Sequence, residues 1–157
     1  MSHPLLGVRI ESTIIFMKRV VLDTNILTAG LCSRQGASFA VLSLFADGQF
    51  QALVTTALFL EYEAVLKRPE QCEVHGFRIA DLDQFLSELA AVLEPVDVHF
   101  TWRPQLSDPA DEMVLEAAVN GRAEMLVTHN IRDFAGAAPR FGIQALRPAE
   151  FLRGVVT

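Results

Sequence analysis

The sequence has 157 residues, of which 51% are hydrophobic and 20% are charged, and its formal net charge at pH 7 is −6. The high apolar content and the modest net charge exclude an intrinsically disordered chain, and the length fits one ordinary domain. The acidic balance also argues, at first sight, against a nucleic-acid-binding protein, whose usual surface is basic.

Neither a membrane location nor a secreted one is expected. The longest apolar run, at 52–60, has about nine residues, about half of what a bilayer-spanning helix needs. The two cysteines, Cys32 and Cys72, have neither metal-ligand spacing nor a disulfide framework, which favours a reducing, cytoplasmic location. No signal peptide precedes the regular pattern, which begins after Met17. We interpret residues 1–16 as an N-terminal extension that is non-native, flexible or an extra short strand, and 17–157 as a single domain.

In the first half of the chain, short apolar runs alternate with longer helical patterns. The run at 20–22 is continuously apolar and ends at Asp23, which is typical of a strand buried on both faces. A second strand is predicted at 52–55. Helices are predicted at 38–47, 57–67 and 79–93, where apolar residues recur at helical spacing. Residues 70–79 fit no single pattern.

The second half continues the alternation. Residues 96–100 alternate like a strand, and 125–128 and 141–146 read as further strands. Asp108 and Pro109 predict the start of a helix that runs to Gly121, because Asp is favoured at the N-cap and Pro at the first helical position. Pro148 begins a short terminal helix. Strands that alternate with helices predict an α/β fold with a parallel sheet covered on both faces.

Acidic and polar residues follow the predicted strands, and ligands of parallel sheets bind beyond the carboxyl ends of the strands. Asp23 ends the first strand, and Asp133 comes soon after the strand at 125–128. Asp111 lies in the first turn of the helix that Asp108 begins. Glu61 lies on the margin of the apolar stripe of the helix at 57–67.

Each acid also has a structural explanation. Asp108 and Asp111 favour the helix dipole by about 1 kcal/mol each, Asp133 could cap a short turn, and Glu61 could be a solvated helix residue. Asp23 is harder to explain in this way, because an acid that closes an apolar strand is costly unless it is paired or bound to a cation. His129 is interpreted as a loop residue.

Several carboxylates at one sheet edge would repel one another strongly if the site held no cation. Clustered carboxylate oxygens select hard divalent cations, Mg²⁺ or Mn²⁺. Carboxylate-bound ions of this kind typically act on phosphates. The residues therefore indicate a metal-dependent site for phosphate chemistry.

Four segments, in order, resemble the PIN-domain ribonucleases, and more narrowly the PIN-family toxins of bacterial toxin–antitoxin pairs. They are VVLDTN at 20–25, LEYEAVLKRP at 60–69, DPADEM at 108–113 and LVTHNIRDF at 126–134. The resemblance covers nearly all of residues 18–154. It implies a three-layer α/β/α sandwich around a central parallel sheet, often dimeric.

The resemblance also implies a set of site residues. The metal-binding and catalytic acids fall on Asp23, Glu61 and Asp111, with Asp133 as the fourth. Many relatives have an Asp where this chain has Asn130, so either Asp133 substitutes or a single ion suffices. The residues implied to orient the carboxylates and water are Thr24, Asn25, Thr128 and Asn130. Arg68, two turns from Glu61 on the same helix edge, and Arg132 are candidates for contacts with RNA phosphates.

The function implied is that of a Mg²⁺- or Mn²⁺-dependent endoribonuclease that hydrolyses RNA phosphodiester bonds and has a cognate antitoxin and a homodimeric state. One alternative is an inactive PIN-like domain that binds protein or RNA. Another is a different doubly wound protein, such as a phosphate-accepting receiver, although no lysine stands near Thr128 as that reading requires. The net charge of −6 is then explained largely by the site itself, because four of the acids would hold cations.

Overall fold

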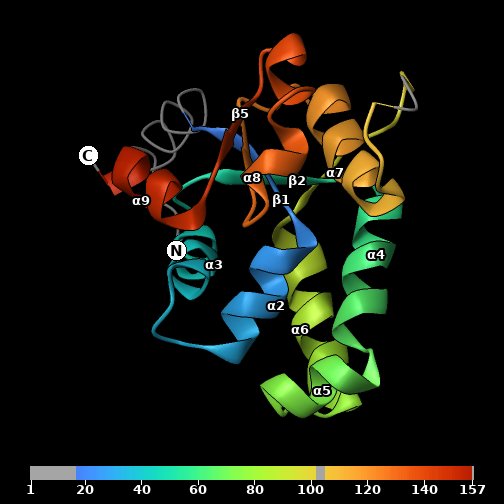
Figure 1. The fold of residues 1–157 in the computed structure, drawn as a ribbon. Helices are drawn as coiled ribbons and strands as arrows, with labels where there is room; N and C mark the ends of the chain where they lie inside the picture. The colour runs from blue at the N-terminus through green and yellow to red at the C-terminus, as the bar shows by residue number, and fades with distance from the viewer. Residues whose placement is uncertain (1–16, 102–104, 157) are drawn as a thin grey trace, which may run out of the picture.

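The computed structural model describes residues 17–101 and 105–156, so the predicted extension at 1–16 lies outside the described residues. A five-stranded parallel sheet, in the order β3-β2-β1-β4-β5, forms the centre of the fold (Figure 1). Its strands are β1 (Arg19–Leu22), β2 (Gln51–Val54), β3 (Glu94–Pro95), β4 (Met125–Val127) and β5 (Gln144–Leu146).

Helices cover both faces of the sheet. They are α2 (Thr24–Cys32), α3 (Ala37–Ala46), α4 (Thr56–Leu66), α5 (Pro69–His75), α6 (Ile79–Val92), α7 (Pro109–Asn120), α8 (Ile131–Phe134) and α9 (Pro148–Val156), with the 3-10 helix η1 (Ala138–Phe141). In Figure 1, α7 lies above the sheet and α2, α3 and α6 lie below it. The predicted α/β/α sandwich is confirmed. No helix in the described ranges is long and apolar enough to cross a membrane.

The core forms where the central strands meet the apolar faces of the helices. Val20, Val21 and Leu22 are almost fully buried, as expected for a central strand whose two faces are covered. The apolar residues predicted at 38–47 contribute to the same core, because α3 packs against α2 and α9 and buries Val41 and Phe45.

Two predicted strands differ from the structure, and one helix was not predicted. Residues 96–100 form no strand: Val96 N–H still bonds to Val54 O, and the chain leaves the sheet after it. The N–H groups of His99 and Phe100 bond instead to Asn120 Oδ1, at 2.7 and 2.8 Å. The strand predicted at 141–146 is limited to β5, since η1 occupies the residues before it. The helix α2 was not predicted at all, and α5 occupies most of the ambiguous stretch 70–79.

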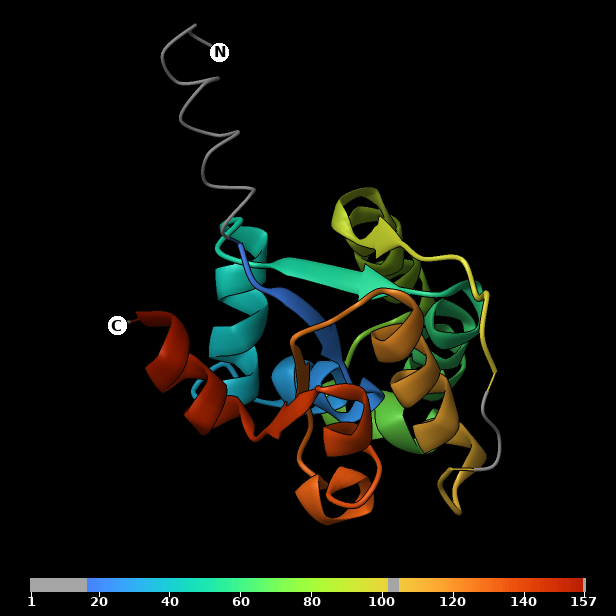
Figure 2. The ribbon, with the colours of Figure 1, turned by 90° about the horizontal axis from the view of Figure 1, so that it is seen from above.

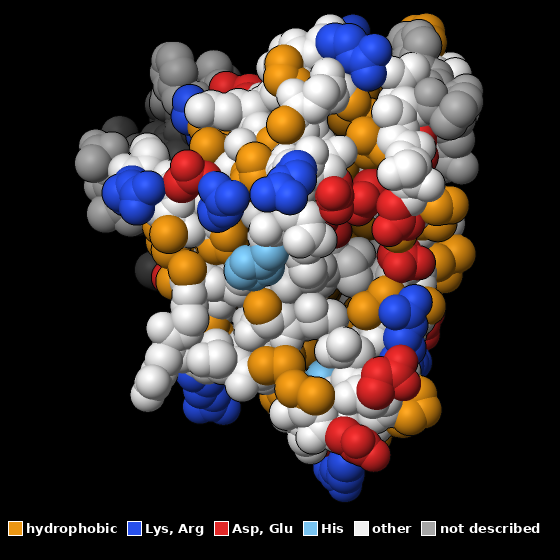
Figure 3. Space-filling model, viewed as in Figure 1, with side chains coloured by type: hydrophobic (Ala, Val, Ile, Leu, Met, Phe, Trp, Pro, Cys, Tyr) orange, Lys and Arg blue, Asp and Glu red, His pale blue; other side chains and the backbone are white. Residues whose placement is uncertain are grey.

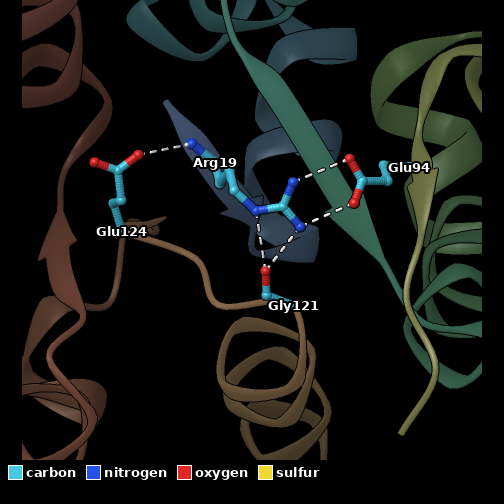
Figure 4. Close-up of polar contacts among 4 residues, drawn as sticks. All are labelled: Arg19, Glu94, Gly121 and Glu124. Carbon is cyan, nitrogen blue, oxygen red and sulfur yellow. Dashed lines mark hydrogen bonds and ion pairs between the residues drawn. The ribbon is translucent and has the colours of Figure 1, made fainter. Parts of the chain in front are cut away.

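Arg19 ties several elements together at the amino end of β1 (Figure 4). Its guanidinium donates to both carboxylate oxygens of Glu94, at 3.1 and 2.8 Å, and twice to Gly121 O, at 3.1 and 2.9 Å. Its backbone N–H donates to Glu124 Oε1. A planar guanidinium is suited to such forked contacts. Arg19 therefore joins β1, β3 and the end of α7 at the sheet edge opposite Asp23.

Arg19→Ala is expected to lower the free energy of unfolding by about 1–3 kcal/mol, because it removes several charge-assisted hydrogen bonds and leaves Glu94 without its partner. Urea unfolding measures this change. Lys18→Ala is the matched control. The Lys18 side chain forms an ion pair with Glu124 at 3.8 Å, and both side chains are half-exposed. Such surface pairs contribute about 0–1 kcal/mol. Equal losses in the two variants would contradict a special role for Arg19.

Candidate active site

The site begins at the carboxyl ends of three neighbouring strands. Asp23 follows β1, and its N–H donates to Val127 O of β4 at 2.9 Å. Thr128 follows β4, and its N–H donates to Leu146 O of β5, also at 2.9 Å. The parallel register therefore places Asp23 and Thr128 side by side at one sheet edge, as the sequence predicted.

Thr128 holds the carboxylate of Asp23. Its hydroxyl donates to Asp23 Oδ2 at 2.7 Å and accepts from Asn130 N–H at 2.9 Å. Asn25 reaches the same hydroxyl through its Nδ2, at 3.5 Å, and accepts the N–H of His129 on its Oδ1. The residues expected to orient the site thus surround Asp23 as a connected network.

Asp23 is 6% exposed, and α2 begins at the next residue, the buried Thr24. Burial raises the pKa of Asp23, because the charged form loses water. The hydrogen bond from Thr128, the backbone N–H groups of Thr24 and Asn25, and the nearby His129 lower the pKa and offset part of that effect. Among the described residues, no Lys or Arg contributes to the shift in the pKa of Asp23.

Asp111 lies in the first turn of α7 and is 8% exposed. Burial, together with the charges of Asp23, Asp108 and Asp133 and a hydrogen bond to Asp133, raises the pKa of Asp111 to about 7. Asp108 caps α7 as predicted, since its Oδ1 accepts from Ala110 N–H at 2.9 Å. Three of the predicted acids therefore lie within electrostatic reach of one another, and Asp108 adds a fourth.

Glu61 is placed differently from the other three predicted acids. It is half-buried on α4, which packs against α7 (Figures 1 and 2). The side chain of Glu61 makes no hydrogen bond or ion pair with any other described residue. Over the same ranges, no three His, Cys, Asp or Glu side chains lie close enough together to hold one metal ion in this conformation.

The arrangement predicted for Arg68 is wrong. It does not share a helix edge with Glu61, because α4 ends at Leu66 and Arg68 directly precedes α5. Arg68 is exposed at the end of α4 that lies away from α7 (Figure 1). Arg132 is exposed on α8, next to Asp133, as the sequence implies.

Two further interactions at the site were not predicted. Tyr62 is 1% exposed, and its hydroxyl donates to Leu22 O at 2.6 Å, directly before Asp23. Burial and the charge of Asp23 raise the pKa of Tyr62, so the hydroxyl stays a donor. The buried Ser38 Oγ also lies 2.7 Å from His129 Nε2. An apolar helical stripe includes Tyr62, but no local signal links Ser38 to a loop about 90 residues away.

The chemistry of these donors fits a hard divalent cation. The charged groups that act on Asp111 are the carboxylates of Asp23, Asp108 and Asp133, and their repulsion contributes to the raised pKa of Asp111. Mg²⁺ and Mn²⁺ prefer such oxygen ligands, whereas Zn²⁺ more often takes nitrogen and sulfur. Acidic side chains also gather on the surface around the start of α7 (Figure 3).

Thr128→Val is expected to weaken Mn²⁺ binding about 10–100-fold, because partners that orient metal-binding carboxylates have effects of that size. Calorimetric titration with Mn²⁺ measures it. Thr28→Val is the control, since the Thr28 hydroxyl bonds only to Asn25 O within α2, at 3.1 Å. Wild-type Mn²⁺ affinity in the Thr128 variant would show that the hydroxyl does not position Asp23.

Comparison with known proteins identifies the family to which this chain belongs. A family model described as a PIN domain matches residues 19–132, and no curated protein matches the chain. One matching solved structure is the crystal structure of VapBC2 from Rickettsia felis bound to a DNA fragment from their promoter. Its matching chain is 18% identical, with a TM-score of 0.55 over 82% of this chain and 98% of that one, a likeness of fold. Because the family model spans well over half of the sequence, the chain belongs to the PIN-domain family.

Proposed function

We propose that this PIN-domain protein is a Mg²⁺- or Mn²⁺-dependent endoribonuclease and the toxin of a toxin–antitoxin pair. The observation that carries the proposal is Asp111, whose pKa rises to about 7 because it is buried among three other acids. Such clustering is costly for stability and is typical of sites built for cations or proton transfer. Family membership makes nuclease chemistry the best explanation of it.

Each residue then has a role that its position supports. Asp23, Asp111 and Asp133 would hold the cation, and Glu61 would complete the set from the adjacent α4. Thr24, Asn25, Thr128 and Asn130 would keep the carboxylates oriented through the network around Asp23. When bound, a divalent ion supplies a more acidic water molecule and neutralises charge that develops on phosphoryl oxygens.

Partners and location are part of the same proposal. The VapBC2 structure that this chain resembles in fold was determined bound to a DNA fragment from its promoter, and the resemblance of the sequence to PIN-family toxins favours a cognate antitoxin for this chain. Exposed apolar residues, including Leu60 and Phe100, which is 58% exposed, are suited to a homodimer contact. The described chain has two free cysteines, Cys32 and Cys72, which agrees with the proposed cytoplasmic location.

The test is cleavage of an end-labelled, mixed-sequence single-stranded RNA by the purified chain. We expect cutting with Mn²⁺ or Mg²⁺ and none with EDTA. A chain that cuts no RNA with either ion would contradict the endoribonuclease proposal.

The second candidate, an inactive PIN-like binding domain, has one observation in its favour. Within the described residues the acids do not close to metal-binding distance as they stand, and Asn130 replaces an acid expected from the resemblance. This candidate predicts that Mn²⁺ leaves the melting temperature unchanged. A functional site predicts stabilisation of about 2.7 kcal/mol when Mn²⁺ is present at one hundred times its dissociation constant.

A further inference from the structure

Charge is distributed unevenly along the chain. Residues 131–157 carry four arginines against two acids, namely Arg132, Arg140, Arg147 and Arg153 against Asp133 and Glu150. The preceding 130 residues carry nine Lys or Arg against seventeen Asp or Glu. The net charge of −6 therefore conceals a basic C-terminal segment, which is a feature that polyanions recognise.

The fold brings this segment to the acidic site. The backbone bond from Thr128 N–H to Leu146 O places Arg147, the next residue, at the carboxyl edge of the sheet beside the strand end of Thr128 and Asp23. Arg132 lies on α8 directly before Asp133, whose carboxylate is hydrogen-bonded to Asp111. Both arginines thus lie in segments that follow strand ends at the sheet edge that carries the acids.

These side chains remain available to an external anion. Arg132 forms no ion pair with any other described residue. The Arg147 side chain is 60% exposed, and its contact with Glu150 is long, at 4.0 Å. Figure 3 shows a row of basic side chains over α8 and α9 that leads to the acidic group at the start of α7. We call Arg132 and Arg147 the C-terminal arginine face.

The other flank of the site has the opposite charge. Helices α4 and α5 carry four acids, namely Glu61, Glu63, Glu70 and Glu73. Lys67, between the two helices, is already paired with Glu63 and Asp83, which leaves Arg68, exposed directly before α5, against these four acids. A polyanion that approaches the acids is therefore attracted from the side of α8 and α9 and repelled from the side of α4 and α5.

Building on the nuclease function proposed above, we propose that single-stranded RNA runs from the acidic site across the C-terminal arginine face. The protein then binds RNA phosphates mainly on one side of the bond that is cut. Guanidinium groups suit this role, because they form paired hydrogen bonds to phosphate oxygens. Contacts of this kind position the strand and carry no base sequence.

The test measures RNA binding without cleavage. Fluorescence anisotropy of a labelled single-stranded RNA is recorded in EDTA at several salt concentrations, for the full chain and for Arg132→Gln/Arg147→Gln. We expect about a tenfold loss of affinity at low salt and a salt slope smaller by about 1.4, since each phosphate contact to a single strand contributes about 0.7.

The matched control is Lys18→Gln/Arg122→Gln, which removes two exposed or half-exposed cations at the opposite sheet edge. It lowers the net charge equally and is expected to bind RNA within about twofold of the wild type. If the double arginine variant does not fold, Arg132→Gln alone is expected to show half of the slope change.

Three results would overturn the proposal. The first is wild-type RNA binding by the arginine variant, and the second is an equal loss in the control. The third is a face that binds a polyglutamate peptide but no RNA, which would make it a protein-docking surface. Because EDTA prevents metal-dependent cutting, a chain that fails to cleave RNA with Mn²⁺ would contradict the nuclease proposal and leave this binding measurement intact.

Discussion

Asp23→Asn is expected to reduce metal-dependent RNA cleavage at least about a hundredfold, because a carboxylate that holds a catalytic cation contributes several kcal/mol to the reaction. The substitution keeps the size of the side chain. Its amide oxygen can still accept the hydrogen bond that Thr128 donates at 2.7 Å, so the sheet edge is expected to stay folded. The rate of cleavage of a labelled RNA at saturating Mn²⁺ measures the loss.

Asp47→Asn provides the control for this variant. Asp47 is an exposed residue at the end of α3, outside the acidic group, and it carries the same charge. We expect its cleavage rate to match that of the wild type. Cleavage by Asp23→Asn at the wild-type rate would show that the acids at the end of β1 do not carry the activity.

Asp111→Asn is expected to stabilise the metal-free protein at pH 8 while it abolishes Mn²⁺ binding. The folded-state pKa of Asp111, about 7, lies above the value of 3.8 for an ordinary aspartate. The folded protein therefore binds this proton more tightly than the unfolded chain, and stability falls as pH rises from about 4 to 7. Asparagine carries no charge, so the variant does not lose this stability as the pH rises. The lower stability of the wild type is the cost of keeping a charged group in the site.

The expected gain is about 1–2 kcal/mol at pH 8 after allowance for solvent screening, or about 2–8 °C in melting temperature. Thermal unfolding in EDTA at pH 4 and pH 8 measures it. The gain should nearly vanish at pH 4, where the wild-type residue is protonated. Asp97→Asn, at an exposed acid outside the site, serves as the control. If the melting temperature of Asp111→Asn at pH 8 equals or falls below that of the wild type, the neighbouring acids do not destabilise the ionised form of Asp111 as proposed.

The parts of the fold that were predicted correctly have strong local signals. The strand at 20–22 is continuously apolar, and Asp108 with Pro109 marks the start of α7, where the Asp108 cap is observed. The helix α2 was missed because it starts directly at the end of β1 with Thr and Asn, which favour caps and turns. Its stability comes from burial of Ile26 and Leu27 in the core, which depends on the rest of the fold.

The false strand at 96–100 has a tertiary cause. Val98 and Phe100 alternate with polar residues as a half-buried strand would, yet both are exposed. The side chain of Asn120, at the end of α7, takes the N–H groups that a neighbouring strand would need. Alternation alone does not show whether a partner strand is present.

The site was predictable in its residue types and its sheet edge, but less so in its geometry. Parallel topology explains why Asp23 and Thr128 meet, because both follow neighbouring strands. The contact between Asp111 and Asp133 could be predicted only from the position of α7 over the sheet, which the local sequence does not show. The contacts of Tyr62 with Leu22 and of Ser38 with His129 link distant segments, and no local pattern in the sequence marks such pairs.

Calorimetric titration of the wild type and Asp111→Asn with Mn²⁺ at pH 6.5 tests most directly whether the acids form a metal site. We expect the wild type to bind Mn²⁺ with a heat that depends on the ionisation enthalpy of the buffer, because Asp111, whose pKa is about 7, must release its proton. Asp111→Asn should neither bind Mn²⁺ nor release a proton. Equal Mn²⁺ binding by the two proteins, or none by the wild type, would contradict the assignment of this acidic group as a metal centre.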